Sequence, residues 1–453
     1  MASRFLVLSP RCLATLPDIL KAVNSDCRRL YVCVDPSLSL SDTLDVVYAH
    51  ASAYAPLLDV RVLLKGGLNK DSLPLREMDN RDDARAPILH QKYGRACLGG
   101  TFDRLHNGHK VLLSRAAMMV KESLVCGVTL PSMNKRKKLW EMIEPIGKRT
   151  AAVQDFVNDV SKVKCEVFEI ADPFGPSVTM PELEAIIVSD ETEKGGIAVN
   201  AEREKRGMRP LVMDKIKLIE GVDNLMQETK LSSSSKRGEA LGTLLRPVNS
   251  QPRFRPYTIG LTGGIASGKS AVAGDLRGMK YEVIDCDKVA HSVYTPGSPL
   301  ALKIAEAFPT VMKDGSVDRK ALGAIIFNDA EHRKRLNGLV WPAVMDAVEK
   351  MLNEGCSSRV VFVEAAALVE AGWHEALHET WTVFCGRDEE VQRVMKRDNM
   401  TLAEAEARLH SQTDNGARLA VSHVALCSDW ARELTRQQVE KAVKLLEERR
   451  LLA

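Results

Sequence analysis

Two stretches of the chain share one pattern, in which a short apolar run passes through a glycine-rich turn into a helical pattern and then into a second apolar run. The first stretch begins at residue 95 and continues through GGTFDRLHNGHK and VLLSRAAMMV to LVCGVT. The second continues from YTIGLTGG through IASGKS and AVAGDLRGM to YEVIDCD. Each stretch is typical of a β-α-β unit. Both therefore predict α/β domains with parallel sheets, whose ligands bind beyond the carboxyl ends of the strands.

Two polar, proline-punctuated connectors separate these stretches from each other and from the N-terminus. They span residues 70–94 and 246–256, and segments of this kind are typical of linkers. The N-terminal region has strand-like runs at 29–34 and 58–64, which favour a small α/β layer, but nothing in it resembles a site. We therefore expect three regions, the first of unknown role: 1–90, 95–245 and 256–453.

Composition excludes two classes of protein. The chain has 453 residues, with 63 Lys+Arg against 60 Asp+Glu and a formal net charge of +3. A genomic nucleic-acid binder normally has a strong basic excess, so we expect no nucleic-acid partner. No uncharged apolar run reaches the about 18 residues that a membrane helix requires, so we expect no membrane span. Small anionic ligands are compatible with this composition.

The ten cysteines are scattered and include no Cys-x-x-Cys pair. This spacing argues against a zinc site or a disulfide framework and favours reduced thiols in a cytosol-like compartment. The first sixteen residues, MASRFLVLSPRCLATL, contain Arg4 and Arg11 and precede the first acid, Asp18. They match either an organellar presequence or a buried first strand and helix. We expect a cytoplasmic protein, with a mitochondrial location as the alternative.

A phosphate-binding loop lies between the strand and the helix of the second stretch. It matches G-x-x-x-x-G-K-[ST] with Gly263, Gly264, Ile265, Ala266, Ser267, Gly268, Lys269 and Ser270. Glycines let successive backbone N–H groups point at phosphate oxygens, and the following helix adds its positive end. Lys269 supplies a cation to the β- and γ-phosphates, and the Ser270 hydroxyl can bind Mg²⁺. The alternative is a glycine-rich turn with an exposed lysine.

Two further features of this region suit phosphoryl transfer. The run VIDCD ends in two acids, which near a phosphate loop predict a base or a magnesium-orienting group, although such acids also form helix caps or turns. Four arginines punctuate the helices around TLAEAEARLHSQ and suit a lid that excludes water. A solvated helix face with i, i+4 ion pairs explains any one of them equally well. They are Arg393, Arg397, Arg408 and Arg418.

In this order, GLTGGIASGKS, VIDCDKVAH, YTPGSP, VEAAALVEAGW and RLHSQ resemble the dephospho-coenzyme A kinase family over residues 256–453. The resemblance implies ATP-dependent phosphorylation of the 3′-hydroxyl of the dephospho-CoA ribose. It also implies that Asp287 is the base, that Lys269 and Ser270 bind phosphate and magnesium, and that Arg397 and Arg408 contact ATP from the lid. One departure is Ala366, where bacterial relatives usually carry a proline.

Three features of the 95–245 region suit a nucleotide. His106 and His109 lie three residues apart at a predicted helix start, so both should face one side, and Gly108 between them lets a ligand approach the backbone. LSSSSKR predicts the N-cap and first turn of a helix GEALGTLL, able to hold a triphosphate. NKRKK is a basic cluster after the second strand. The alternatives are a structural histidine pair, a flexible linker and a solvated face, respectively.

HNGH with SSSSKR resembles the nucleotidyltransferases with H-x-G-H and S-S-[ST]-x-x-R motifs. The fuller match, with CLGGTFDRLHNGHKVLL, KKLWEMIEP and VSDETEKGG, is similar to the animal type of phosphopantetheine adenylyltransferase over 95–245. The implied reaction is attack of the 4′-phosphopantetheine phosphate on the α-phosphorus of ATP, which releases pyrophosphate. The implied catalytic residues are His109, His106 and Lys135, with Lys138 as the alternative lysine. The implied binding residues are Thr101, Phe102, Ser232, Ser233, Ser234 and Arg237.

Together the resemblances imply the arrangement of the bifunctional coenzyme A synthases: a Rossmann-like nucleotidyltransferase domain followed by a P-loop kinase domain, after a small N-terminal α/β region. The implied ligands are ATP with Mg²⁺, 4′-phosphopantetheine and dephospho-CoA. Protein partners are not predicted. Two alternatives keep the same motifs. One is a nicotinamide-mononucleotide-type adenylyltransferase joined to a ribosyl kinase, and the other is a nucleotide-binding scaffold without turnover.

Overall fold

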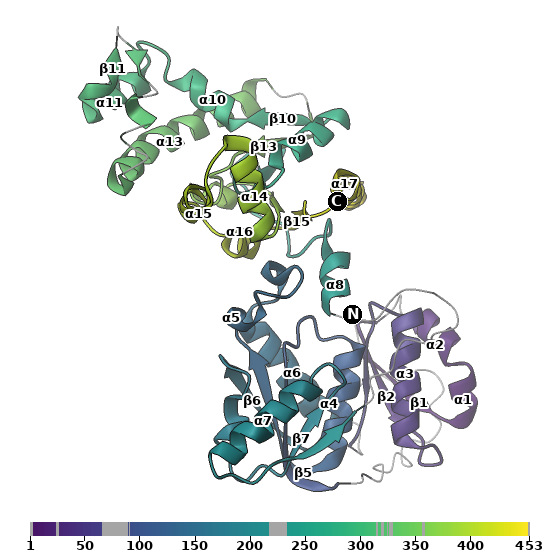
Figure 1. Ribbon diagram of the computed structural model, residues 1–453. Coiled ribbons are helices and arrows are strands. Elements are labelled where there is room, and N and C mark those ends of the chain that lie inside the picture. Colours follow the sequence, from purple (N-terminus) through teal and green to yellow (C-terminus); the bar gives the residue numbers. More distant parts are fainter. Residues whose placement is uncertain are drawn as a thin grey trace. The chain divides into compact units, whose positions relative to one another are not determined.

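The chain divides into two compact units, Met1–Gly238 and Glu239–Ala453, and each is described by itself (Figure 1). Both units contain parallel sheets flanked by helices, which confirms the predicted α/β class. The computed structural model describes residues 3–23, 27–65, 89, 91–216, 233–313, 316–318, 321–323, 325, 329–355 and 358–451.

The N-terminal region forms a three-stranded parallel sheet of order β1-β2-β3 with helices between the strands. Strand β2 coincides with the apolar run predicted at 29–34, and its residues alternate between buried and half-buried. Leu6 and Leu8 of β1 are buried, so residues 3–8 form the buried first strand that was one of the two interpretations of the N-terminal sequence. The elements are β1 Ser3–Leu8, α1 Pro10–Ala14, α2 Leu16–Val23, β2 Arg29–Val34, α3 Leu40–Tyr54 and β3 Asp59–Val62.

A five-stranded parallel sheet of order β6-β5-β4-β7-β8 follows in the same unit. Its central strand, β4, leads directly into the TFD turn and the histidine helix α4, as the β-α-β pattern predicts. The strands are β4 Tyr93–Gly100, β5 Val120–Thr129, β6 Lys164–Ile170, β7 Ala185–Val188 and β8 Val212–Lys215. The helices are α4 Asn107–Met119, α5 Pro131–Asn134, η2 Trp140–Met142, α6 Ile146–Val160, η3 Gly175–Val178, α7 Glu193–Lys205 and α8 Ser233–Ala240.

One hydrophobic core serves both sheets of this unit. Tyr48 and Val60 of the N-terminal region belong to the same buried cluster as Leu113 of α4 and Phe156 of α6. Burial of apolar surface is the main favourable term in folding, so a shared core couples the two parts energetically. Residues 3–23 and 27–65 are therefore packed as an integral layer of the unit. The three-region division stays a prediction.

The helix predicted at GEALGTLL is displaced toward the serines. Helix α8 begins at Ser233 and ends at Ala240, so Ser233 and Ser234 lie in its first turn, as predicted, but the helix ends five residues earlier than GEALGTLL predicts. Gly242 has φ +70°, and a Cβ atom there would lie 2.5 Å from the carbonyl oxygen of Gln438. A left-handed glycine commonly ends a helix, which explains why the helix does not continue through residue 245.

The second unit is built on a five-stranded parallel sheet of order β10-β13-β9-β14-β15, with β9 at its centre. Its core includes Trp381, which is fully buried, and Phe362, whose ring packs against it edge to face. The strands of this sheet are β9 Tyr257–Thr262, β10 Glu282–Asp285, β13 Val360–Glu364, β14 Glu379–Phe384 and β15 Val424–Cys427.

Helices surround this sheet, and a short antiparallel pair lies apart from it: β11 Met312–Lys313 and β12 Ser316–Val317. The helices are α9 Lys269–Gly278, α10 Cys286–Val293, α11 Pro299–Ala307, η4 Pro309–Val311, α13 Ala330–Glu354, η5 Trp373–Glu375, α14 Arg387–Asp398, α15 Leu402–His410, α16 Asn415–Val421 and α17 Arg432–Leu451. Within the described residues, every helix is too short or too polar to cross a membrane. The nine cysteines in the described ranges are free thiols.

Candidate active sites

The turn after β4 is strained and fully packed. Phe102 and Arg104 have φ of +49° and +48°, a region in which non-glycine residues cost about 1–3 kcal/mol each. Asp103 between them is completely buried and accepts the backbone N–H of Glu144 at 2.9 Å. The Phe102 side chain is buried as well. Packing on both sides thus holds Thr101 in one position at the carboxyl end of the central strand.

The two histidines stack at the start of α4. His106 is the N-cap residue, and the ring centroids of His106 and His109 are 3.9 Å apart. Burial lowers the pKa of His106 to about 4, and burial together with His106 and Lys137 lowers the pKa of His109 well below its usual value. Both rings are therefore neutral at pH 7. The Nδ1 atom of His109 accepts the His106 backbone N–H at 3.5 Å, so we assign the proton to Nε2.

Of the basic cluster NKRKK, Lys137 is the lysine that reaches the turn. Its Nζ donates a hydrogen bond to Thr101 Oγ1, and burial and the nearby Arg237 lower its pKa. Lys135 is exposed, and the backbone carbonyl of Lys138 accepts a hydrogen bond from Arg237 Nε at 3.0 Å. The sequence interpretation named Lys135 and Lys138 and missed Lys137. Adjacent lysines in one polar run carry no signal that separates them.

A second residue missed from the sequence is Arg149, in the first turns of α6. Its buried guanidinium donates to the carbonyls of Thr101, Thr129 and Glu144 at 2.7, 2.9 and 2.8 Å. These bonds connect the carboxyl ends of β4 and β5 around the site. Nothing in the sequence distinguishes this arginine from those on solvated helix faces.

Helix α8 brings the serine run to the histidine turn. Ser233 Oγ donates to the Asp103 carbonyl at 3.3 Å and lies 3.5 Å from His106 Nε2. Arg237 is fully buried and donates to Asp103 Oδ2 at 2.6 Å and to Ser234 Oγ at 3.0 Å. In this structure Arg237 therefore links α8 to the TFD turn, and its role toward a triphosphate stays a prediction.

Ser232 lies outside the described residues.

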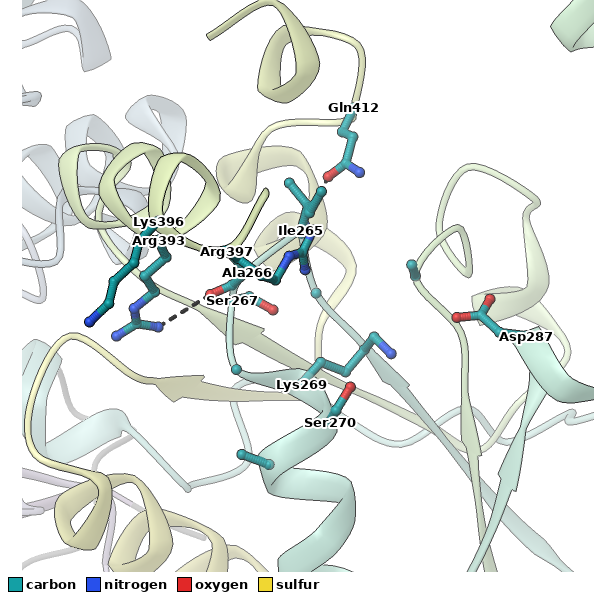
Figure 2. Close-up of a pocket in the computed structure, with 15 residues that line it drawn as sticks. Ile265, Ala266, Ser267, Lys269, Ser270, Asp287, Arg393, Lys396, Arg397 and Gln412 are labelled. Atoms are coloured by element: carbon teal, nitrogen blue, oxygen red, sulfur yellow. Dashed lines mark hydrogen bonds between the residues drawn. The ribbon is translucent and has the colours of Figure 1, made fainter. Parts of the chain in front are cut away.

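In the second unit, the phosphate loop lies where the motif predicts it, between β9 and α9. Gly268 has φ +90°, and a Cβ on Gly263 would lie 2.5 Å from Ser267 Oγ, so both positions require glycine. The loop borders a cavity of about 910 Å³, and Figure 2 shows the side chains around it. The lining residues are Gly263, Gly264, Ile265, Ala266, Ser267, Gly268, Lys269, Ser270, Ala271, Asp287, Ala366, Arg393, Lys396, Arg397 and Gln412.

Glu364 at the end of β13 holds the functional groups of this loop. Its Oε1 atom lies 2.7 Å from Lys269 Nζ and accepts Ser270 Oγ at 3.4 Å, while Oε2 accepts Arg277 Nη2 at 3.3 Å. The Glu364 side chain is buried. The sequence interpretation assigned it no role, although an acid at the end of the apolar run VVFVE is the signal that could have found it.

The two acids of VIDCD have different surroundings. Asp285 caps helix α10, since its Oδ1 accepts the backbone N–H groups of Asp287 and Lys288 at 3.1 and 3.2 Å. Asp287 lines the cavity, and Figure 2 shows its carboxylate facing the phosphate loop from the opposite side. Capping therefore occupies one acid and leaves the other toward the cavity.

The four arginines that were predicted to belong to a lid have different surroundings. Arg393 lines the cavity and donates to Ala266 O at 3.3 Å and to Ser428 Oγ at 2.8 Å. Arg397 also lines the cavity, and it shares the carboxylate of Asp398 with Arg408.

Arg408 is absent from the cavity wall, and the buried Arg418 pairs with Glu370 at 2.8 Å. Gln412, which the sequence interpretation missed, accepts the Ile265 backbone N–H at 3.0 Å.

Two family models match the chain. The model described as dephospho-CoA kinase matches residues 257–431, and the model described as cytidylyltransferase-like matches residues 97–239. The dephospho-CoA kinase of Moorella thermoacetica is 41% identical over 191 residues, which are 41% of this chain and 90% of that protein. That of Geobacter sulfurreducens is 40% identical over 187 residues, which are 40% of this chain and 95% of that protein.

Among solved structures, the dephospho-CoA kinase from Campylobacter jejuni is 27% identical and covers 42% of this chain and 97% of that chain, with a TM-score of 0.35.

Proposed function

Because the chain belongs to the dephospho-CoA kinase family through residues 257–431 and carries a cytidylyltransferase-like domain over 97–239, we propose that it catalyses two successive transfers. The first unit transfers the adenylyl group of ATP to 4′-phosphopantetheine and releases pyrophosphate. The second unit phosphorylates the ribose 3′-hydroxyl of the resulting dephospho-CoA. The observation that carries this proposal is that each unit has its own motif-bearing turn, followed by a helix N-terminus, at the carboxyl end of its central strand, β4 or β9.

Adenylyl transfer at the first site needs no general base, because the attacking phosphate is already an anion. Catalysis then depends on orientation and on stabilisation of the charge that develops at the α-phosphorus. We assign His109 as the donor to the α-phosphate through Nε2–H, with His106 supporting it in the stack. Thr101 and Lys137, which are hydrogen-bonded to each other, would bind the acceptor phosphate, and Lys135 is the alternative cation.

The β- and γ-phosphates would lie at the N-terminus of α8. Ser233 and Ser234 are in its first turn, where backbone N–H groups and the helix dipole favour anions. Ser232 and Arg237 complete this proposed group. The buried ion pair between Arg237 and Asp103 supports a role for the arginine in holding α8 against the TFD turn. Arg237 also donates to Ser234 Oγ and so helps to position this serine.

At the second site, the backbone of the phosphate loop and the start of α9 would hold the ATP phosphates. Lys269 would exchange its pairing with Glu364 for the β- and γ-phosphate oxygens. Asp287 would accept the proton of the ribose hydroxyl from the opposite wall of the cavity. Arg393 and Arg397 would neutralise the transferred phosphoryl group, while Arg408 would act through the shared Asp398.

The oxygen donors beside Lys269 suit a magnesium ion. Ser270 Oγ and Glu364 Oε1 lie 3.4 Å apart at the end of the phosphate loop, and Mg²⁺ prefers carboxylate, hydroxyl and phosphate oxygens. Bound with ATP, the ion supplies positive charge to the β- and γ-phosphates. Ser270 and Glu364 are the residues that would hold it.

The free thiols of the described ranges are consistent with a reducing compartment, and we propose the cytosol, with mitochondria as the alternative.

The experiment that tests the proposal supplies purified protein with ATP, Mg²⁺ and 4′-phosphopantetheine and follows the products by mass spectrometry. We expect dephospho-CoA, then CoA, with pyrophosphate and ADP released. Dephospho-CoA with ATP should give CoA and ADP alone. Nicotinamide mononucleotide and nicotinamide riboside serve as control acceptors. Turnover of these controls without CoA formation would contradict the proposal. Binding of ATP without release of pyrophosphate or ADP would contradict it as well.

A further inference from the structure

Strand β3 of the N-terminal region is bonded to both helices that begin at the histidine site. Helix α4 starts with the turn that carries His109, and helix α6 carries Arg149, which holds the Thr101 carbonyl. Asp59 and Arg61 of β3 reach these two helices from outside the five-stranded sheet. The N-terminal region, for which the sequence suggests no function, therefore touches the supports of the proposed adenylyl-transfer site.

The contact with α4 is an ion pair immediately next to His109, in which the lysine is buried and Asp59 is 30% exposed. Lys110 follows His109, and its Nζ lies 2.6 Å from Asp59 Oδ1 and 3.0 Å from the Val60 carbonyl. The Lys110 side chain is only 6% exposed. A cation in the first turn of a helix is unfavourable to the helix dipole, and a buried one needs a partner. Asp59 provides that partner and thereby fixes the first turn of α4.

The contact with α6 comes from Arg61. Its Nη1 and Nη2 atoms donate to Asp159 and Asp155 at 2.7 and 2.9 Å, and its Nε lies 3.1 Å from Asp59 Oδ2. The Arg61 side chain is 6% exposed, whereas Asp155 and Asp159 are 58% and 28% exposed, so the arginine is buried and its partners lie toward the surface. One pair of strand residues thus connects α4 and α6, and a displacement of β3 would move both helices together.

A third contact acts on the histidine motif itself. Asn107 lies between His106 and Gly108, and its Nδ2 donates to Ser52 Oγ of α3 at 2.9 Å and approaches the Tyr48 carbonyl at 3.5 Å. Asn107, the second residue of HNGH, is therefore bonded to the N-terminal region, so its amide Nδ2 is already engaged within the protein. Asn107 and Lys110 are three residues apart, so they lie on one face of α4, and both bond the N-terminal region.

Building on the adenylyl transfer proposed above, we propose that the N-terminal region is a positioning element of that reaction. Asp59 and Ser52 are positioning residues that hold the first turn of α4, with His106 and His109, in the orientation that transfer requires. Catalysis by orientation is sensitive to small shifts, and a displacement of about 1 Å costs up to about 100-fold in rate. This gives the described part of the N-terminal region a role in the chemistry although none of its residues lies in the turn that carries it.

The test compares Asp59→Asn and Ser52→Ala with the matched control Asp45→Asn in the full-length protein. Asp45 pairs with Arg115, so it joins α3 to α4 as the Ser52–Asn107 bond does, but Arg115 lies about two turns beyond the histidines. We expect kcat for pyrophosphate release to fall at least about 10-fold in Asp59→Asn and about 3-fold in Ser52→Ala, with smaller changes in KM for ATP. The control should stay within about 2-fold.

Three further measurements make the result decisive. Asp59→Glu keeps the carboxylate and should recover part of kcat. Phosphorylation of dephospho-CoA by each preparation should match wild type, which checks the concentration of intact chain. If Asp59→Asn fails to fold by circular dichroism, the milder Ser52→Ala carries the test.

Two results would overturn the proposal: wild-type kcat in both variants, or an equal loss of kcat in Asp45→Asn. Absence of pyrophosphate release from the wild-type protein would instead refute the adenylyl transfer itself.

Discussion

The Nζ atom of Lys269 lies 2.7 Å from Oε1 of Glu364, so the lysine of the phosphate loop is paired with a carboxylate at the end of a neighbouring strand. Both side chains are largely shielded from water. The pair holds the amine of Lys269, which lines the cavity, against Glu364 and puts a carboxylate beside Ser270. Glu364 is therefore placed to act on both groups that the phosphate-loop motif predicts as ligands of ATP and Mg²⁺.

Replacement of this carboxylate should disable the second site. We expect Glu364→Gln to lower the rate of ADP formation with dephospho-CoA by about 100- to 1,000-fold, the usual effect of removing one preorganised charged group from a transferase site. Arg277→Gln is the matched control, since Arg277 contacts only the outer oxygen Oε2, and it should lose less than about 5-fold. Coupled ADP assays measure both. Near-normal turnover in Glu364→Gln would exclude this role.

The two sites should be separable by single substitutions. His109→Ala removes the donor at the first site and should abolish pyrophosphate release while dephospho-CoA phosphorylation stays largely intact. Lys269→Ala should have the reverse effect, because the loop it belongs to lies in the other unit. Each half-reaction is measured on the same preparation. Loss of both activities in either variant, with the protein still folded, would show that the sites are not independent.

Lys137 should matter more than its neighbours for adenylyl transfer. Lys135 and Lys137 are both exposed residues, but the amine of Lys137 donates to Thr101 and its pKa is lowered by partial burial and by Arg237. We expect Lys137→Ala to slow pyrophosphate release about 100-fold and Lys135→Ala less than about 5-fold, since only a preorganised cation stabilises the transition state strongly. Steady-state kinetics with 4′-phosphopantetheine distinguish the two. A larger loss in Lys135→Ala would restore the assignment made from the sequence.

The first unit should lose stability in mild acid. The folded-state pKa of His106 is lowered to about 4 by burial, while an unfolded histidine titrates near about 6.5. Between these values the unfolded chain binds more protons than the folded chain, so stability falls as the pH is lowered from about 6.5 to about 4. In His106→Asn this loss should be smaller.

Hydrogen exchange of the α4 amides, corrected for intrinsic rates and compared with α9 amides of the same sample, measures this loss. Equal acid sensitivity of wild type and His106→Asn would contradict the prediction.

Much of the fold follows from local pattern. The apolar run at 29–34 is strand β2, and the two β-α-β patterns are strands and helices of two parallel sheets. The phosphate loop is recognisable from the sequence because its eight residues are consecutive, so the residues that form the motif also determine the backbone geometry of the loop. His106 and His109 were found for the same reason, since one helical turn brings them together.

Tertiary structure decided which side chains complete these sites. Glu364 is 95 residues from Lys269, and only the order of the strands brings the two together. Arg149 reaches Thr101 from a helix 48 residues away.

The sequence by itself determined two motif-bearing turns, each at the end of a strand, because a run of consecutive residues sets its own backbone, and their motifs predict phosphate binding. The choice of Lys137 over Lys135, and the bond between Asp59 and Lys110 that attaches the N-terminal region to the histidine helix, belong to the folded chain alone. Such contacts depend on packing between segments distant in sequence, and the local sequence of one segment does not identify its partners in another.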